Sequence, residues 1–186
     1  MLLDFKYVEF FVANAKQASH FYRSIFGFTG HAYSGPETGN EEFVSYVLKQ
    51  NKIFFVLTTA LSKDHKISRW VQKHGDGVSE IAFGSDAVVD DYNYAIDNGA
   101  TSSNKHIELI DSNGKYQMAS VKTYGEVVHS FVDNSEYNGI WKPGYVSYSP
   151  DDIPTNKTDL LLVDHIVGNV EDNNMNNWID YYERSF

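Results

Sequence analysis

His165 is the residue whose type and setting point most directly to chemistry. It lies between Asp164 and Ile166 in an apolar run, where an imidazole without a partner would be costly to bury. Imidazole is a frequent metal ligand, but many buried histidines only form hydrogen bonds to the backbone. From the residues alone, a metal ligand and a hydrogen-bonded core histidine both remain open.

The other histidines give weaker signals. His106 and His129 fall on predicted strands but lie too far apart in sequence for a local metal motif. The remaining four are His20, His31, His65 and His74. The sequence contains no HExxH zinc motif, no GxxxxGK[ST] phosphate loop, no GxSxG nucleophile turn and no CxxC pair. Acidic pairs such as Glu41-Glu42 are interpreted as side chains on solvent-exposed faces.

The composition excludes several classes of partner. A formal net charge of −10 gives no electrostatic reason to bind nucleic acid or an anionic membrane surface. No cysteine is present, which excludes a disulfide framework and fits a reducing cytosol. No apolar stretch approaches the ~20 residues needed to span a bilayer. We therefore expect a soluble, cytoplasmic protein with no nucleic-acid or membrane partner.

The elements that would position these side chains form a repeated pattern. Residues 6–13 predict a strand, and Asn14 predicts the N-cap of a helix that ends at Gly27. Residues 43–49 and 52–58 predict a hairpin, and residues 64–74 predict a short helix. The chain continues with a strand at 78–83, a helix capped by Ser85 or Asp86, and strands at 106–110, 116–123 and 127–132. The order β-α-β-β-β therefore occurs twice.

The last residues begin the pattern a third time. Val163–Asn169 resembles Val8–Asn14, and the run that closes on Phe186 resembles the run that closes on Phe26. Residues 160–167 predict a strand, and residues 178–186 predict a helix. Residues 137–158 are rich in proline and glycine and predict a linker. A repeat that starts again without being completed predicts a longer parent protein.

Several motifs along the chain match one known family. They are Tyr22, Gly27-Phe28, Glu37-Thr38-Gly39, Lys52–Leu57, Lys73–Val78, Ile81–Phe83, Thr123-Tyr124-Gly125, Pro143-Gly144-Tyr145 and Asp164–Asn169, in that order. Together they make the sequence similar to the N-terminal part of the 4-hydroxyphenylpyruvate dioxygenase family, within the vicinal oxygen chelate superfamily. The resemblance covers nearly the whole chain.

The resemblance implies an α+β fold of paired βαβββ modules that form a curved mixed sheet with helices on its outer face. It implies a metal-free N-terminal domain at residues 1–136, a linker at 137–158, and the start of a truncated catalytic domain at 159–186. The family binds Fe(II) through two histidines and one glutamate, so His165 carries over as a metal ligand. The other two ligands would lie beyond Phe186.

The resemblance also implies a reaction. A triad of two histidines and a carboxylate leaves open positions on iron for an α-keto acid and dioxygen. We expect the parent enzyme to convert 4-hydroxyphenylpyruvate and O2 to homogentisate and CO2 in tyrosine catabolism. The 186-residue chain by itself is expected to be inactive and to hold no iron stably.

Three other functions remain open at this point, one of which is a purely structural or interaction domain. Hydroxymandelate synthase resembles the same family and uses the same substrate and metal, and the residues that select its product are expected to lie beyond Phe186. A non-enzymatic small-molecule-binding protein of the superfamily is the second alternative. The exposed apolar residues of the 160–167 run favour association with another copy, so a homo-oligomer is expected.

Overall fold

The computed structural model describes residues 2–150 and 156–186, which form two compact units. Unit 1 contains residues 2–6, 80–137 and 164–186, and unit 2 contains residues 7–79, 138–150 and 156–163. The boundary falls within the strands β1 (Leu2–Phe11) and β5 (Gly77–Ser85). Each unit contains one β-α-β-β-β module.

The module of unit 2 begins with β1 and α1 (Ala15–Phe26). It continues with β2 (Thr29–Ser34), the short 3-10 helix η1 (Pro36–Thr38), β3 (Phe43–Gln50) and β4 (Ile53–Ala60). Its sheet has the order β1-β4-β3-β2-β9, where β9 is Val146–Ser147. β1 runs parallel to β4, and the other pairs are antiparallel. The helix α2 (Lys66–His74) follows β4.

The module of unit 1 repeats this topology. β5 is followed by α3 (Val88–Asp97), β6 (Thr101–Asp111), β7 (Gly114–Lys122), the 3-10 helix η2 (Tyr124–Glu126) and β8 (Val128–Asp133). The sheet order is β6-β7-β8-β5, with β5 parallel to β8. The predicted pair of βαβββ modules is confirmed.

Local signals explain where α1 begins and ends. The side chain of Asn14 accepts a hydrogen bond from the Gln17 backbone N–H at 3.0 Å, as an N-cap should. Gly27 closes the helix with φ +72°, a left-handed conformation that favours glycine. On its buried face Tyr22 packs against Phe55 of β4 at 5.4 Å, and Phe55 stacks on Phe28 at 4.8 Å.

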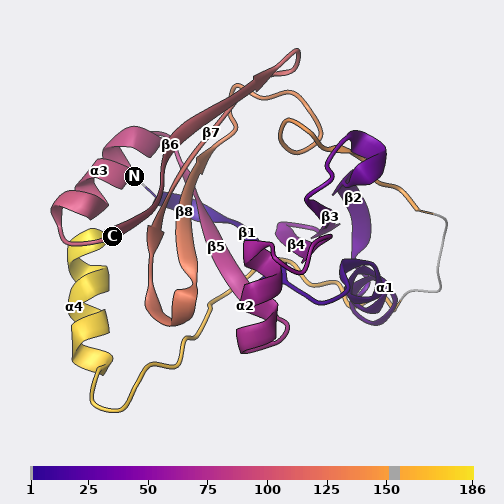
Figure 1. The fold of residues 1–186 in the computed structure, drawn as a ribbon. Coiled ribbons are helices and arrows are strands. Elements are labelled where there is room, and N and C mark those ends of the chain that lie inside the picture. The colour runs from indigo at the N-terminus through magenta and orange to yellow at the C-terminus, as the bar shows by residue number, and fades with distance from the viewer. Residues whose placement is uncertain (1, 151–155) are drawn as a thin grey trace. The chain divides into compact units, whose positions relative to one another are not determined.

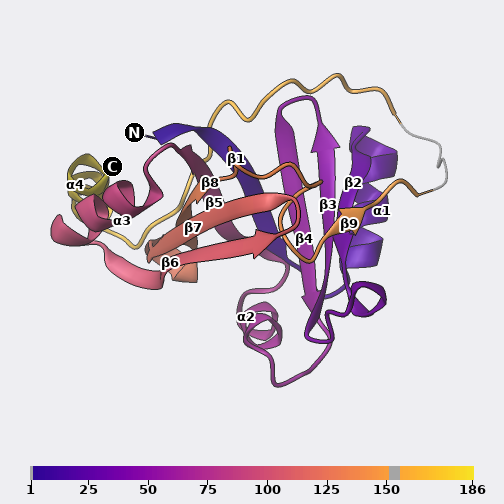
Figure 2. The same ribbon diagram turned by 90° about the horizontal axis from the view of Figure 1, so that it is seen from above.

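Helix α4 (Met175–Ser185) packs beside α3 in unit 1, as Figures 1 and 2 show. Its Tyr181 and the adjoining Phe186 contact the core beneath α3, which includes Ala95, Ala119 and Phe131. The predicted helix at 178–186 is therefore confirmed. No described helix is both long and apolar enough to cross a membrane.

Three sequence predictions need correction. The strand β2 lies outside the ranges predicted for strands. Helix α3 was predicted to be capped by Ser85 or Asp86, but it starts after Ala87 and has no side-chain cap. The Ser85 hydroxyl instead accepts a hydrogen bond from the Ala87 N–H at 3.0 Å. The strand predicted at 160–167 is wrong, because residues 156–170 form neither helix nor strand. A strand needs a backbone neighbour along its length. The β3–β4 turn reaches only the start of this run, where Lys52 N–H donates to the Leu161 carbonyl at 3.0 Å.

Candidate functional site

His165 lies on the irregular segment of unit 1 that precedes α4. Its side chain is 74% exposed, and its Nδ1 lies 2.7 Å from the Asp164 carboxylate. An ionised carboxylate can only accept, so Nδ1 is the donor in this pair. The imidazole faces solvent, so of the two alternatives the buried core histidine is not the one observed, and the role of metal ligand stays a prediction. The contact with Asp164 orients the imidazole ring through Nδ1.

The described residues do not complete a metal site. Among them, no group of three or more His, Asp or Glu side chains could hold an ion together. A site with two histidines and a carboxylate needs three such donors, and the described part of the chain offers His165 as one. The residues at hand therefore do not fit a complete iron centre.

A cavity of about 490 Å³ lies within unit 1, beside the segment that carries His165. Phe5, Phe83 and Ile166 give it apolar walls, and His129 of β8 and Tyr182 of α4 contribute polar atoms. Nε2 of His129 lies 2.8 Å from the Tyr182 hydroxyl. The cavity is mostly apolar with few polar groups, as small-molecule pockets commonly are.

Burial controls the charge of this histidine and tyrosine. His129 is 3% exposed, and burial lowers its pKa to about 4 because the charged imidazolium loses its hydration. Burial likewise raises the pKa of Tyr182. Both side chains are therefore neutral at pH 7, and their contact is a hydrogen bond between uncharged groups.

A second cavity, of about 540 Å³, lies beside the start of α1 in unit 2. It includes Asp76 from the Lys73–Val78 motif and Tyr22 of α1. The Asp76 carboxylate accepts a bond from the Ala13 N–H at 2.7 Å. Burial and the nearby Asp76 charge raise the pKa of Tyr22. The hydrogen bond of Asp76 thus connects the turn before β5 to the turn before α1.

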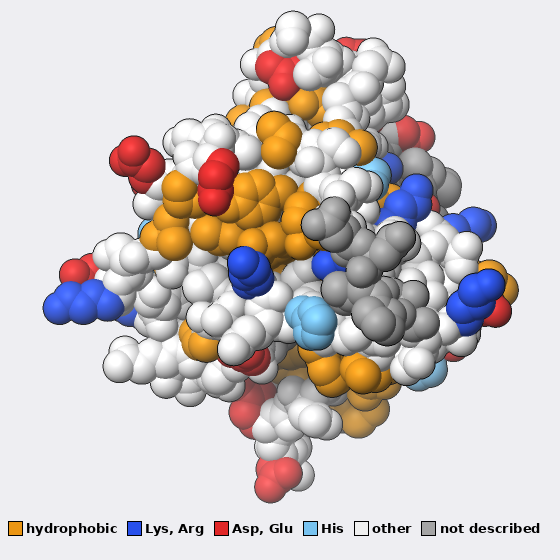
Figure 3. Space-filling view, turned by 90° about the vertical axis from the view of Figure 1, so that its right-hand side faces the viewer, with side chains coloured by type: hydrophobic (Ala, Val, Ile, Leu, Met, Phe, Trp, Pro, Cys, Tyr) orange, Lys and Arg blue, Asp and Glu red, His pale blue; other side chains and the backbone are white. Residues whose placement is uncertain are grey.

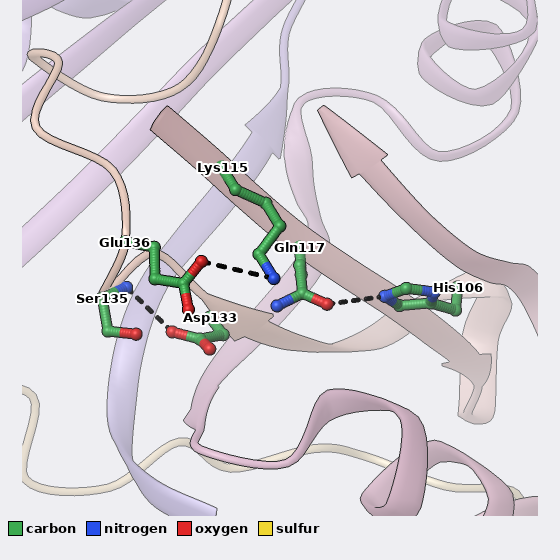
Figure 4. A network of polar contacts seen from close by, with 6 residues as sticks. All are labelled: His106, Lys115, Gln117, Asp133, Ser135 and Glu136. Atoms are coloured by element: carbon green, nitrogen blue, oxygen red, sulfur yellow. Dashed lines mark hydrogen bonds and ion pairs between the residues drawn. The ribbon is translucent and has the colours of Figure 1, made fainter. Parts of the chain in front are cut away.

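The polar cluster in Figure 4 is structural. His106 on β6 lies 3.0 Å from the Gln117 side chain on β7, and Lys115 lies 3.3 Å from the Glu136 carboxylate. The side chain of Asp133 accepts from the Ser135 N–H within a turn. These contacts join neighbouring strands and close a turn, and the exposed Lys115–Glu136 pair contributes at most about 1 kcal/mol.

The remaining histidines are dispersed. His20 is exposed on α1, and His31 bonds through Nε2 to the Ile140 carbonyl at 2.9 Å. His65 caps α2, and His74 packs against Trp70 at 4.8 Å. None of these contacts involves His165.

Sequence reasoning missed the contact between His129 and Tyr182. The two residues are 53 positions apart, and each sits in an element that was interpreted from its apolar neighbours. Nothing in the local pattern of either element links them. Their contact depends on where α4 packs.

Surface charge is mixed where it can be seen. On the face in Figure 3, acidic and basic side chains are scattered among apolar and neutral ones, and hydrophobic side chains gather in a large patch and in smaller ones. On α1 alone, Phe21 and Ile25 are 50% and 45% exposed.

Comparisons with known proteins identify the relatives of this chain. No protein-family model matches the sequence. The chain is 38% identical over 185 residues to a 4-hydroxyphenylpyruvate dioxygenase of Dictyostelium discoideum, covering 97% of this chain and 50% of the relative. It is 37% identical over 193 residues to the Danio rerio protein of that name, covering 98% and 47%. The chain is a homologue of 4-hydroxyphenylpyruvate dioxygenases.

The chain spans about half the length of these dioxygenases. Among solved structures, a mutant of 4-hydroxymandelate synthase from Streptomyces coelicolor matches 100% of this chain and 52% of its own, with TM-score 0.85 and 27% identity. A methylmalonyl-CoA epimerase variant from the same organism matches 71% of this chain and 97% of its own, with TM-score 0.58 and 21% identity. The dioxygenase homologue therefore has the vicinal oxygen chelate fold.

Proposed function

We propose that this chain is the N-terminal part of an Fe(II)-dependent dioxygenase that converts 4-hydroxyphenylpyruvate and O2 to homogentisate and CO2. The observation that carries the proposal is identity of 33–38% over nearly the whole chain to relatives of that name. In this proposal residues 1–136 are a metal-free domain, 137–158 a linker, and 159–186 the start of the catalytic domain. The pathway served is tyrosine catabolism.

We propose His165 as one of the iron ligands of that enzyme. Its pairing with Asp164 through Nδ1 supports this role, because histidine ligands usually donate their second N–H to a carboxylate or carbonyl group. The imidazole is exposed, so Nε2 is accessible to an ion. The other donors would come from residues outside this chain, and one imidazole cannot hold ferrous iron in a three-donor site.

Activity assays test the proposal. The purified 186-residue protein with ferrous iron and ascorbate is expected to form no homogentisate. A longer protein that includes the missing donors is expected to form it, and His165→Gln in that protein should abolish the product. His20→Gln, at an exposed position on α1, is the matched control and should leave activity unchanged. Homogentisate from the 186-residue chain, or an active His165→Gln enzyme, would contradict the proposal.

Hydroxymandelate synthesis is the second candidate function. The structural match to a 4-hydroxymandelate synthase mutant at TM-score 0.85 favours it. The two enzymes differ in product, so mass spectrometry of the reaction mixture separates them. We expect homogentisate, because the identity to proteins named dioxygenase, up to 38%, exceeds the 27% identity to the synthase. 4-Hydroxymandelate as the main product would select the second candidate.

A further inference from the structure

Helices α1 and α4 occupy equivalent places in the repeated pattern of the chain. The run that closes on Phe26 resembles the run that closes on Phe186. Tyr22 corresponds to Tyr182 and Phe26 to Phe186, and the members of each pair lie 160 positions apart. Each residue of α1 therefore has a counterpart on α4, so the contacts of one helix can be compared with those of the other.

Helix α1 buries one face and exposes another. Its buried face, which includes Ala15 and Ser19, packs against β3 and β4 of its own module. Its outer face consists of Phe21, Ile25 and Phe26, which are 50%, 45% and 37% exposed. The rings of Phe21 and Phe26 lie 5.7 Å apart, so these residues form an apolar patch. Exposed patches mark interaction sites more often than single exposed residues do.

On α4 the two faces exchange roles. Met175 and Ile179, at the positions that α1 buries, are 66% and 42% exposed. The counterparts of the outer face of α1 are Tyr181, Ser185 and Phe186. Tyr181 and Phe186 pack against the core of unit 1, and Ser185 is 1% exposed. The face that is exposed on α1 is therefore the face that unit 1 covers on α4.

The contacts of α4 show which kind of surface fits such a face. The Tyr182 hydroxyl lies 2.8 Å from Nε2 of His129 on β8 and 3.0 Å from Oγ1 of Thr123. The ring of Phe186 lies 5.8 Å from Phe131, which is also on β8. Helix α3 of the same module lies beside α4. The fitting surface is thus formed by the helix and adjoining strands of a β-α-β-β-β module.

We propose that the outer face of α1 is the interface for a further module of the unit 1 kind. This inference rests on the proposed function, in which this chain is the N-terminal part of a longer enzyme. Unit 2 carries the first module of the chain and unit 1 the second, and α4 belongs to the start of a third. A fourth module would correspond to unit 1, and it would cover α1 as unit 1 covers α4.

Thiol labelling tests this interface. The chain contains no cysteine, so one introduced cysteine reports on one position. Ile25→Cys suits the test, because the counterpart on α4 is the small, buried Ser185, and a thiol of similar size fits a covered surface. In the 186-residue chain this thiol should react with a maleimide as an exposed thiol does. In the longer enzyme it should react at least about 10-fold more slowly, as measured by peptide mapping with mass spectrometry.

His20→Cys is the matched control on the same helix. His20 is exposed, and so is its counterpart Asp180 on the packed helix α4. This thiol should therefore react equally fast in both proteins. Equal rates at position 25 in the two proteins would overturn the inference. Protection at position 25 that disappears on dilution would assign the face to a second copy, which would also overturn it.

The product assay separates this inference from the proposed function. If the longer protein protects position 25 but forms no homogentisate, the interface stands and the proposed function is wrong. If the longer protein forms homogentisate while position 25 reacts as fast as in the 186-residue chain, the function stands and the interface is wrong.

Discussion

The two β-α-β-β-β modules share one topology but fill the space beneath their helices differently. In unit 2, aromatic rings fill it: Phe28 stacks on Phe55, and Tyr22 packs against both. In unit 1, the core beneath α3 combines the large ring of Phe131 with several small residues, including Ala95 and Ala119, each fully buried. Small side chains leave volume that must be occupied by other atoms.

Helix α4 supplies the missing volume in unit 1. Tyr181 and Phe186 pack against the core that contains Phe131. Both modules use residues from later in the chain, but in different forms. Tyr148 and Val163 pack against the core of unit 2, whereas α4 and the adjoining Phe186 pack against the core of unit 1. The comparison shows that the same topology can be completed by single side chains of a later segment or by an added helix.

Truncation of one buried ring in each module should give the largest effects. Phe28→Ala is expected to cost about 4–5 kcal/mol, because its aromatic neighbours cannot collapse into the gap. Phe131→Ala should cost about 3 kcal/mol, because α4 can shift toward the cavity. Urea denaturation measures both values. Phe21→Ala, at a half-exposed position, is the control and should cost under about 1 kcal/mol. A larger cost for Phe131→Ala would contradict the adaptable core of unit 1.

The pH dependence of stability should reveal the buried histidine of unit 1. Folded His129 has a pKa of about 4, against 6.5 for an ordinary histidine. As pH falls from 6.5 to 4, the unfolded chain binds a proton that the folded chain does not. The stabilisation is complete above pH 6.5, and roughly 3 kcal/mol of it is lost by pH 4. Chemical denaturation at a series of pH values measures this slope.

A variant isolates this contribution from that of the carboxylates. His129→Gln cannot titrate, so its free energy of unfolding should fall less steeply between pH 6.5 and 4 than that of the parent chain. His20→Gln removes an exposed histidine and should retain the parent slope. Parallel curves for the parent chain and His129→Gln would show that His129 ionises normally in the folded state.

The smallest expected effect on stability concerns the start of α1, which has a side-chain cap, in contrast to the start of α3, which has none. Asn14→Ala removes the side-chain cap of α1 and should cost about 1 kcal/mol. Lys16→Ala in the exposed first turn should stay within about 0.5 kcal/mol. α3 begins after Ala87 with no side-chain cap, so it has no equivalent bond to lose. Thermal denaturation suffices for the comparison, and an Asn14→Ala protein as stable as the parent chain would contradict the capping role.

Local signals predicted most helices and strands. Asn14 and Gly27 marked the ends of α1 because capping depends on the residue itself and its near neighbours. The same reasoning was wrong at residues 160–167, where an apolar β-branched run lacks a neighbouring strand in the described chain. Strand formation needs a partner that a local pattern does not identify.

For the candidate site, too, the sequence predicted one part and the structure was needed for the rest. The sequence singled out His165, because an imidazole in an apolar run is costly to bury without a partner, and the family resemblance implied the role of metal ligand. Its exposure and the pairing of Nδ1 with Asp164 required the structure. The sequence pattern did not predict the cluster of His129, Thr123 and Tyr182. Its hydrogen bonds join residues more than 50 positions apart, so they depend on how α4 packs against the sheet.

Residue types and short-range order thus determined the two modules and the ends of α1, because these depend on interactions within a few positions. The placement of α4 against the small residues beneath α3 depended on complementary volumes from distant parts of the chain. The neutral state of His129 depended on the same packing, because desolvation acts only once the chain has folded around the group.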